Sequence, residues 1–455
     1  MSVIDDVLKY IATNEIRWID LQFYDIKGSL HRVTISNRKI EESSFGNGIY
    51  AADLFEVFGN SNQGELVLLP DPETLARLPW ETSTVRLLCD VVVSGNKEKF
   101  VKDPRYVAER METNLGAAGI KSALLGSEME FYLFDSANAD KLANSRGTGV
   151  LVDSREASWS PFALSSNTKG AYLATPNDLM YGVRNQIAES MEDNFGMPVD
   201  AHRHGRSKTA QQTFELSERS LKSAADATNT LKFATKNIAA ALNLQSSFMP
   251  YPISNEKGSS LNASVSLWKS SDSNLFYDAK DDYAQLSQSG RYFVGGLLEH
   301  SSALAAFCAP TPNSYGRLAA DPKRFGWSAT KKDSLVFIPC GKRNVKEVKR
   351  VVFTLPDPSA NPYLAFSAIV AAGLDGIKNK TEPGDPAEVE SKKRVEKKLP
   401  MSLSESISAL NSDSKFIKGI ISTELLDDFT SLKMRQHSKS LLGVSATEMV
   451  EYFNV

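Results

Sequence analysis

The first hundred residues show two kinds of hydrophobic periodicity. Apolar residues at helical spacing predict a helix over residues 3–13, and alternating apolar and polar residues then predict strands within residues 16–35. The Lys27-Gly28 pair interrupts this alternation and is typical of a β-hairpin turn. Further strand-like runs occupy residues 65–69 and 85–93. This part of the chain is therefore predicted to be rich in strands.

A helix start marks the end of the strand-rich part. Asp103 is a good helix-capping residue and Pro104 suits the first helical turn, so we expect a helix to begin there. We place a domain boundary at this cap, which gives an N-terminal domain of residues 1–103 and a C-terminal domain of residues 104–455. Further helices are expected over residues 177–195, 217–242, 287–306 and 363–377, and near the end of the chain over residues 404–411, 413–421 and 424–434.

The strand predicted over residues 124–135 carries two carboxylates in an otherwise apolar run. Glu128 and Glu130 are two residues apart, so their side chains point to the same face of the strand. Neighbouring carboxylates repel each other unless a cation, either a metal ion or a basic side chain, lies between them. The alternative is that both are solvated on an exposed strand face. The sequence therefore raises the question of which cation balances this pair.

Length, composition and charge narrow the class of protein. A chain of 455 residues with 42% hydrophobic content can bury a large core and is expected to form two globular domains. The net charge of −3 gives no basic field of the kind that nucleic-acid-binding proteins show. No apolar run reaches the roughly 18 residues of a membrane span, and the acidic N-terminus does not resemble a signal peptide. We therefore expect a cytoplasmic protein with neither nucleic acid nor membrane as a partner.

Nine short motifs occur in a fixed order along nearly the whole chain. The most informative are Gly126-Ser-Glu-Met-Glu-Phe131 and Leu355-Pro-Asp-Pro-Ser-Ala-Asn-Pro-Tyr-Leu364. The other seven lie at residues 20–28, 69–72, 103–107, 169–172, 248–250, 266–269 and 312–318. Together, in this order, they resemble the glutamine synthetases in their bacterial and archaeal type I form.

The resemblance implies an α+β fold in which a small N-terminal β-grasp-like domain precedes a large C-terminal domain with a curved antiparallel sheet and helices. It also implies homo-oligomeric rings of six subunits, stacked in pairs as a dodecamer, with active sites between neighbouring subunits. Enzymes of this family use ATP with Mg²⁺ or Mn²⁺ to phosphorylate glutamate before ammonia displaces the phosphate. Such phosphoryl transfer depends on divalent cations together with Arg or Lys to hold negative charge.

Most positions that bind metal in this family are substituted in this chain. Glu128 and Glu130 match the first two ligands and are the remnant of the family's metal site. Where the family carries two glutamates, two histidines, a glutamate and an arginine, this chain has Arg206, Thr213, Asn262, Ser264, Val352 and Thr354, respectively. A slip in the alignment would move Glu215 into the position of Thr213, but nothing acidic lies near Arg206. We therefore expect neither a metal nor a cofactor, and we assign no catalytic residue.

Other positions of the site also differ from the family. Lys332 and Phe337 stand where arginines are expected, and lysine lacks the forked donor geometry of arginine. The flap segment, residues 319–324, contains no glutamate to take a proton from ammonium. Only Asp53 stands in for the latch that the family contributes to the neighbouring subunit, one position out of register. Arg317 matches the position that holds the glutamate carboxylate, so Arg317 and Lys332 are candidates for anion binding.

A basic segment, residues 202–208, lies among these substituted positions. Its two histidines, His202 and His204, are a second candidate for metal binding, although surface histidines without a further ligand seldom bind a metal. Arg206 takes the place of a metal-binding glutamate, so its side chain is expected to enter the same space. A guanidinium can bridge two carboxylates through its fork of donors. We therefore predict that Arg206 forms an internal ion pair with both Glu128 and Glu130 in place of a metal ion.

These substitutions support a leading hypothesis and an alternative. The leading hypothesis is a glutamine synthetase-fold homologue that has lost ATP-dependent glutamine synthesis and acts by ligand binding, assembly or regulation in nitrogen metabolism, with an active paralogue as a further candidate partner. The alternative is an ATP-dependent glutamate–ammonia or glutamate–amine ligase. Relatives that join glutamate to amines keep the metal carboxylates, and the loss of those carboxylates here favours the leading hypothesis. The sequence leaves open whether the protein is an enzyme.

Overall fold

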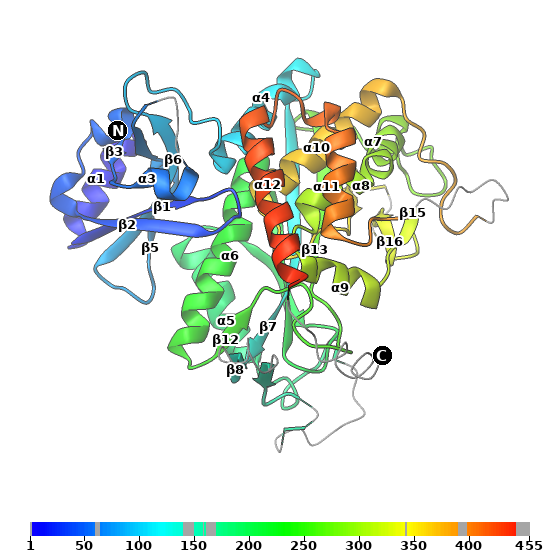
Figure 1. The fold of residues 1–455 in the computed structure, drawn as a ribbon, viewed down its shortest axis with the longest axis horizontal. Coiled ribbons are helices and arrows are strands. Elements are labelled where there is room, and N and C mark those ends of the chain that lie inside the picture. Colours follow the sequence, from blue (N-terminus) through cyan, green and yellow to red (C-terminus); the bar gives the residue numbers. More distant parts are fainter. Residues whose placement is uncertain are drawn as a thin grey trace.

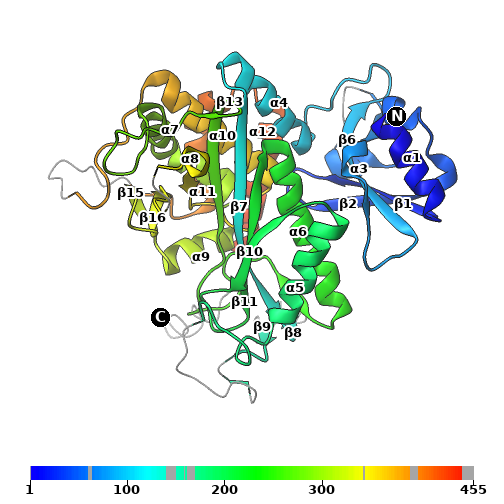
Figure 2. The same cartoon turned by 180° about the vertical axis from the view of Figure 1, so that it is seen from behind.

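A computed structural model of the chain describes residues 2–59, 64–139, 150–157, 159–160, 170–341, 344–389 and 398–442. It shows a smaller N-terminal part beside a larger C-terminal body (Figures 1 and 2). Each part has its own hydrophobic core, one drawn from residues 7–100 and the other mainly from residues 76–429. The expected α+β fold is therefore confirmed, whereas the boundary at residues 103/104 stays a prediction. No helix among the described residues is long and apolar enough to cross a membrane.

The N-terminal part is a six-stranded sheet with short helices. Its strand order is β2-β1-β6-β4-β3, with β5 paired to β6. The predicted hairpin is β1 and β2, and the glycine of its turn, Gly28, has a φ of 84° and packs against Asn361, where an added Cβ would lie 3.2 Å from the Asn361 backbone. The elements are α1 (Val3–Thr13), β1 (Trp18–Tyr24), β2 (Leu30–Ser36), α2 (Ser44–Asn47), β3 (Ile49–Tyr50), α3 (Leu54–Phe58), β4 (Leu66–Pro70), β5 (Ala76–Arg77) and β6 (Thr84–Val93).

The C-terminal body is built around a nine-stranded sheet. Its order is β10-β11-β7-β13-β17-β16-β15, with β12 on β7 and β14 on β13. All of these pairings are antiparallel except that of β15 with β16. The strands are β7 (Ser122–Phe134), β10 (Val199–His204), β11 (Gln211–Ser220), β12 (Gln245–Ser247), β13 (Leu261–Ser270), β14 (Ser273–Asn274), β15 (Arg324–Ser328), β16 (Ser334–Phe337) and β17 (Val351–Phe353), and a separate hairpin joins β8 (Ser136–Ala139) to β9 (Val150–Asp153).

Helices cover one face of this sheet. Figure 1 shows α12 in front of the strands, and from behind β7 and β13 are seen with no helix over them (Figure 2). Met129 and Phe131 of β7 belong to the large core, so Glu128 and Glu130 point to the opposite face. The helices are α4 (Pro104–Ala117), α5 (Tyr181–Glu189), α6 (Leu221–Ala241), α7 (Gln288–Glu299), α8 (Ser301–Cys308), α9 (Pro312–Ala320), α10 (Pro362–Asn379), α11 (Leu403–Ser412) and α12 (Thr423–Ser440).

Four helix predictions need correction. The helix expected from residue 177 begins only at Tyr181, and its last turn, Ser190–Asn194, is a π-helix. The helix expected from residue 217 begins only at Leu221, because β11 continues through Ser220 in pairing with β7. The helix expected over residues 287–306 is two helices, α7 and α8, that meet at His300. The segment 413–421 contains only the short 3₁₀ helix Lys415–Ile417, which is followed by separate turn hydrogen bonds and not by a continuous helical ladder. Periodicity located these segments but did not resolve their ends.

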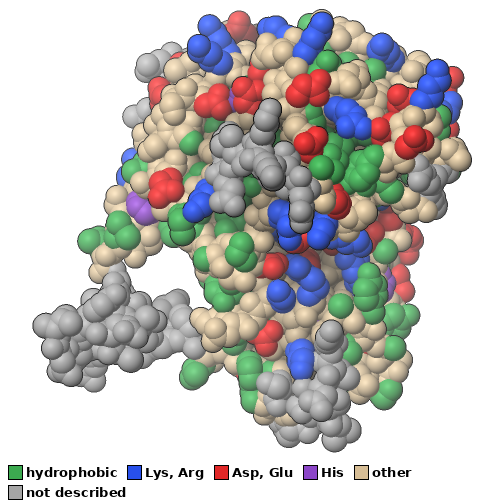
Figure 3. Space-filling model, turned by 90° about the vertical axis from the view of Figure 1, so that its right-hand side faces the viewer, with side chains coloured by type: hydrophobic (Ala, Val, Ile, Leu, Met, Phe, Trp, Pro, Cys, Tyr) green, Lys and Arg blue, Asp and Glu red, His purple; other side chains and the backbone are tan. Residues whose placement is uncertain are grey.

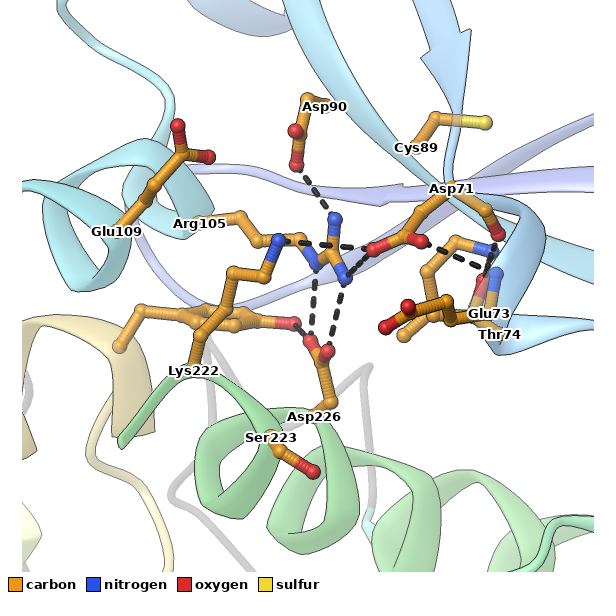
Figure 4. A network of polar contacts seen from close by, with 12 residues as sticks. Asp71, Glu73, Thr74, Cys89, Asp90, Arg105, Glu109, Lys222, Ser223 and Asp226 are labelled. Atoms are coloured by element: carbon orange, nitrogen blue, oxygen red, sulfur yellow. Dashed lines mark hydrogen bonds and ion pairs between the residues drawn. The ribbon is translucent and has the colours of Figure 1, made fainter. Parts of the chain in front are cut away.

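A buried arginine joins the two parts. Arg105, near the start of α4, contacts Asp71 after β4 at 2.6 Å, Asp90 of β6 at 2.5 Å and Asp226 of α6 at 2.9 Å (Figure 4). The hydroxyl of Tyr363 donates to the same Asp226 carboxylate. Burial alone disfavours the charged form, but Asp226 and Asp90 raise the pKa of Arg105 well above its usual value. This ion cluster fixes strands of the small sheet against helices of the large domain.

Candidate functional site

A cavity of about 430 Å³ opens on the face of the large sheet that carries Glu128 and Glu130. Cavities of this size accept small-molecule ligands. Of the ten site positions taken from the sequence, all line it except Ser264 and Arg317. Its described lining is Glu128, Glu130, Tyr172, Arg203, Gly205, Arg206, Thr213, Glu215, Ser260, Asn262, Lys323, Lys332, Phe337, Pro339, Arg350, Val352 and Thr354.

Strand register determines which side chains surround the two carboxylates. Thr213 of β11 lies directly opposite Glu130, and Glu215 of the same strand lies opposite Glu128. On the other side, Asn262 of β13 is the partner of Glu128. Glu128 and Glu215 are thus like charges facing each other across two strands, an arrangement that is destabilising unless a cation bridges them. Unless a metal ion is bound, basic side chains must therefore balance the carboxylates on the cavity floor.

Arg206 supplies that charge to Glu130. Its Nε lies 3.2 Å from Glu130 Oε1 and its Nη2 lies 3.4 Å from Oε2, while the backbone N–H and hydroxyl of Ser260 donate to Oε2 at 2.9 and 2.7 Å. Burial, the largest influence, acts to raise the pKa of Glu130, but Arg206 and Ser260 outweigh it and hold the pKa below its usual value. Glu130 is therefore an ionised carboxylate whose oxygens are fully engaged by the protein itself.

A second arginine, Arg203, neutralises Glu128. Its Nη2 lies 2.9 Å from Glu128 Oε1, and its Nη1 donates to Glu215 Oε1 at 2.5 Å. Burial and the two neighbouring glutamates raise the pKa of Glu128 in spite of Arg203. The predicted ion pair of Arg206 is therefore confirmed with Glu130 and wrong for Glu128, which Arg203 contacts instead.

Geometry explains why two arginines are present. Side chains two residues apart on a strand are separated by about 7 Å, more than one guanidinium spans while keeping good hydrogen bonds to both. Arg206 turns its other end to Asp321, with Nη1 3.2 Å from Oδ2, and Lys257 Nζ lies 3.4 Å from the same carboxylate. Asp321 belongs to the shortened flap segment. Asp321 of the flap thus fixes the position of Arg206 through an ion pair, and Arg203 balances the charges of Glu128 and Glu215.

Two predicted anion or site positions lie outside the cavity lining. Arg317 is 3% exposed, its Nη2 donates to the Leu355 carbonyl oxygen, and its Nε lies 3.9 Å from Asp357 Oδ2. Burial, the largest influence, lowers the pKa of Arg317. Ser264 lies on the same sheet face as Asn262 but outside the cavity lining, and its hydroxyl accepts a hydrogen bond from Gly126 N at 3.2 Å. Both side chains therefore contact neighbouring residues of the domain, and neither lines the cavity.

The two histidines of the basic segment point away from Arg203, as alternation along β10 requires. His204 is buried and its Nε2 lies 3.1 Å from Glu156 Oε2, while His202 packs against Phe214. Neither lines the cavity. The second metal-site candidate therefore gains no support from the structure.

Two basic residues on the far wall, Arg350 and Lys323, were not predicted from the sequence, whereas Lys332 was a candidate for anion binding. Arg350 Nη1 lies 3.4 Å from Glu218 Oε1, and its Nε is buried with no hydrogen-bond partner among the described atoms. Lys323 comes from the flap segment, and Lys332 from the turn between β15 and β16. The signal for Arg350 was present, because period-2 alternation places it on the same face as Val352 and Thr354. Lys323 has no comparable signal, since it lies outside any strand.

Asp53 lies elsewhere. It precedes α3 in the N-terminal part, with a left-handed φ of 63°, and is not in the cavity lining of its own chain.

Phe337 does line the cavity and brings an apolar ring where the resemblance implied an arginine. Tyr172 stands at the cavity with its ring 5.7 Å from the Arg203 guanidinium. Lys169, which begins the motif containing Tyr172, lies outside the described residues.

The residues present do not fit the divalent metal that the family uses. The Glu130 oxygens already accept hydrogen bonds from Ser260 and Arg206, and the nearest neighbours of the pair are permanently charged guanidinium groups, which have no lone pair to donate to a metal. Thr213 and Val352 add no carboxylate. Within the described ranges, no group of three or more His, Cys, Asp or Glu side chains is arranged to hold a metal ion.

Comparison with known proteins identifies the family. Residues 15–94 match the glutamine synthetase β-grasp domain, and residues 101–452 match the glutamine synthetase catalytic domain. The chain is 37% identical over 464 residues to a glutamine synthetase of Sulfolobus acidocaldarius, covering 99% of this chain and 98% of that one. It is 32% identical over 485 residues to a glutamine synthetase of Rhizobium meliloti, with full coverage of both.

Solved structures agree on the fold. A Plasmodium falciparum glutamine synthetase superposes with a TM-score of 0.87 at 22% identity over 99% of each chain. A structure described as apo GmaS without ligand superposes with a TM-score of 0.82 at 25% identity, over 98% of this chain and 99% of that one. The chain therefore belongs to the glutamine synthetase family, with the β-grasp and catalytic domains in the family order.

Proposed function

We propose that this chain is a glutamine synthetase homologue that binds a small ligand in its cavity and does not make glutamine. The observation that carries this proposal is the pairing of Arg206 with Glu130 and of Arg203 with Glu128. These ion pairs take up the two carboxylates that match the family's first metal ligands, and Arg203 also pairs with Glu215, the third carboxylate of the described lining. An internal cation thus does the electrostatic work that a metal does in the family, but it offers no open coordination position to a phosphoryl oxygen.

The chemical consequence is a large loss of transition-state stabilisation. Transfer of phosphate from ATP to glutamate concentrates negative charge that metal ions normally neutralise, and each such electrostatic contribution is worth on the order of 3 kcal/mol or more. Arg203 and Arg206 are positively charged, yet their donors are already turned to Glu128, Glu215, Glu130 and Asp321. They are not free to follow the transferring phosphate.

A direct assay tests the proposal. Purified protein supplied with glutamate, ammonium, ATP and either Mg²⁺ or Mn²⁺ is expected to form no glutamine above background. Glutamine formation above background that requires Mg²⁺ or Mn²⁺ would overturn it, and Glu130→Gln then tests whether that turnover depends on the carboxylate. A glutamine synthetase purified in parallel confirms that the assay conditions are permissive.

The second candidate function is an ATP-dependent glutamate–ammonia or glutamate–amine ligase. The comparisons favour this candidate, since relatives that align over the full chain at 30–37% identity are named glutamine synthetase. The basic residues retained in the cavity suit a phosphate-bearing substrate equally well under this candidate. Assays with ammonium and a series of primary amines, scored by ADP release and by product mass, decide for this candidate if any amine gives product.

We also propose that the protein assembles into six-membered rings, paired as a dodecamer. Membership of the family and the presence of both domains in order support this. Multi-angle light scattering at micromolar concentration is expected to give a mass of six or twelve times 49.9 kDa. A monomeric mass would contradict it. Co-expression with an active glutamine synthetase tests whether mixed rings form.

A further inference from the structure

A second cavity, of about 410 Å³, is lined by residues of both parts of the chain and shares no lining residue with the cavity on the large sheet. Pro79 and Trp80 come from the loop between β5 and β6 of the N-terminal part. The remaining lining comes from α5, from the π-helical turn that follows it and from the end of α6. Small-molecule sites occur preferentially at such junctions between domains.

An aromatic ring and aliphatic side chains form the apolar part of this lining. The Trp80 ring packs against Phe233 and Phe195, with ring centroids 5.2 and 6.2 Å apart. Ile238 and Leu242 are four residues apart, so they lie on one side of α6. Leu242 is 39% exposed. Water therefore contacts an apolar surface that the hydrocarbon part of a ligand would cover.

Two carboxylates without a partner stand at the same cavity. Glu189 and Asp193 both line it, and neither side chain has a hydrogen-bond or ion-pair partner among the described residues. The described lining contains no lysine or arginine, whereas basic side chains gather in the middle of the face shown in Figure 3. The cavity thus carries negative charge that is available to a cation.

The π-helical turn positions one of these carboxylates. Ser190–Asn194 follow α5 directly, and Phe195 N donates to the Ser190 carbonyl oxygen, five positions back, at 3.3 Å. Such turns are rare in proteins and occur frequently at functional sites. Three of the five residues of this turn, Ser190, Asp193 and Asn194, line the cavity. The helix therefore departs from regular α geometry at the residues that face the cavity.

We propose that this cavity binds a small organic cation, an ammonium group carried on an aromatic or aliphatic body. The ammonium group donates to the carboxylates of Glu189 and Asp193, and the body packs against Trp80 and Leu242. A cation close to the Trp80 ring also gains from cation–π attraction. Because the ligand contacts a loop of the N-terminal part and helices of the C-terminal body, it stabilises the folded chain and should raise its unfolding temperature.

Saturation-transfer NMR of the full-length protein with 2-phenylethylamine as the probe tests this. Saturable binding is expected, and it should weaken at about 0.5 M salt, which screens exposed charges. 2-Phenylethanol, which lacks the charge, and 3-phenylpropionate, which reverses it, should bind about tenfold more weakly, the combined size of two exposed ion pairs and one cation–π contact.

Substitutions assign the binding to this cavity. Asp193→Asn and Glu189→Gln should each weaken binding of 2-phenylethylamine about threefold, and the double variant about tenfold. Both residues are exposed, so the variants are expected to fold. Glu192→Gln is the matched control, because Glu192 carries the same charge in the same turn but does not line the cavity, and a glutamine can still accept the hydrogen bond from Val199 N.

Three results would overturn the inference. They are no binding of 2-phenylethylamine, binding that is indifferent to both carboxylate substitutions, and equal binding of 2-phenylethanol. Binding that survives the double variant would place the amine elsewhere, for example in the cavity on the large sheet. The site shares no residue with that cavity, so none of these results depends on whether the protein makes glutamine.

Discussion

Arg206 holds Glu130 by two contacts, Nε to Oε1 at 3.2 Å and Nη2 to Oε2 at 3.4 Å, across 76 positions of sequence. The two residues are brought together because β10 ends beside β7 through β11, which places the following loop over the strand that carries Glu130. The carboxylate is 4% exposed at its side chain and the arginine 42%. One partner is thus buried and the other reaches water.

The first prediction concerns this pair. Arg206→Gln should lower the free energy of unfolding by about 1–2 kcal/mol, less than the figure for a fully buried pair, because water can reach the vacated side of Glu130. Urea denaturation measures the change. The double variant Glu130→Gln with Arg206→Gln should lose less stability than the two single variants added together.

Arg155→Gln is the control for that prediction. Arg155 has the same 42% side-chain exposure and pairs with Asp135, but outside the cavity and with a more exposed carboxylate. It should cost about 0–1 kcal/mol. If Arg206→Gln costs no more than Arg155→Gln, the internal pair does not stabilise the fold.

The second prediction follows from the lowered pKa of Glu130. A carboxyl whose pKa is lower in the folded state contributes stability that is complete above its unfolded value of 4.5 and is lost as the pH falls through the folded value. Wild-type protein should therefore exceed Glu130→Gln in stability at pH 6 by more than at pH 3. Thermal unfolding at both pH values measures the two differences. A difference that does not change with pH would show that Glu130 is not held ionised by its partners.

The third prediction addresses the joint between the two parts. Arg105 is 2% exposed and contacts three aspartates. Arg105→Gln leaves buried Asp226 without an ion-pair partner among the described residues, whereas Asp90 keeps Lys99 and Asp71 keeps Lys222. We expect a loss of about 3–5 kcal/mol and separate unfolding of the two parts in calorimetry. Arg110→Gln, on the same helix, removes a hydrogen bond to the Gly419 carbonyl and a cation–π contact with Tyr106, and should change little. Equal effects of the two substitutions would contradict the role given to the cluster.

The fourth prediction concerns the pH dependence of anion binding. Burial, then Arg317 and Arg206, lower the pKa of Lys323 to about 8, against the opposing influence of Asp321 and Glu130. Sulfate, whose own charge is constant over this range, should bind progressively more weakly between pH 7 and pH 9 as Lys323 loses its proton. Lys323→Met should bind more weakly at pH 7 and show a flatter profile. A profile unchanged by that substitution would assign the titration to another group.

The sequence predicted much of the scaffold because long, strongly periodic segments determine their own structure. Helix α1 spans the predicted residues, Asp103 caps α4 through a hydrogen bond to Arg105 N, and Glu128 and Glu130 share a face as alternation requires. Errors arose where tertiary pairing decided the outcome. Pairing with β7 extends β11 through Ser220, and the amino-acid propensities of that segment do not predict this extension.

The sequence predicted most of the residues at the site but not which side chains pair with each other. Alignment to a family positioned Arg206 near the carboxylates, yet which guanidinium reaches which carboxylate depends on strand register and on Asp321, a residue from a loop more than a hundred positions away. Arg203 was visible only as part of a basic segment. Lys323 is close to the cavity solely because the flap folds over it, and that is a property of the folded chain.

Manganese binding to the full-length protein is the measurement that tests the central claim most directly. Electron paramagnetic resonance of free Mn²⁺ should detect no saturable site in wild-type protein, because arginines occupy the space beside Glu128 and Glu130. The variant Arg206→Glu with Thr213→Glu, which sets two carboxylates beside Glu130, should gain Mn²⁺ binding and serves as the positive control. Stoichiometric Mn²⁺ binding by the wild-type protein that Glu130→Gln abolishes would contradict the account.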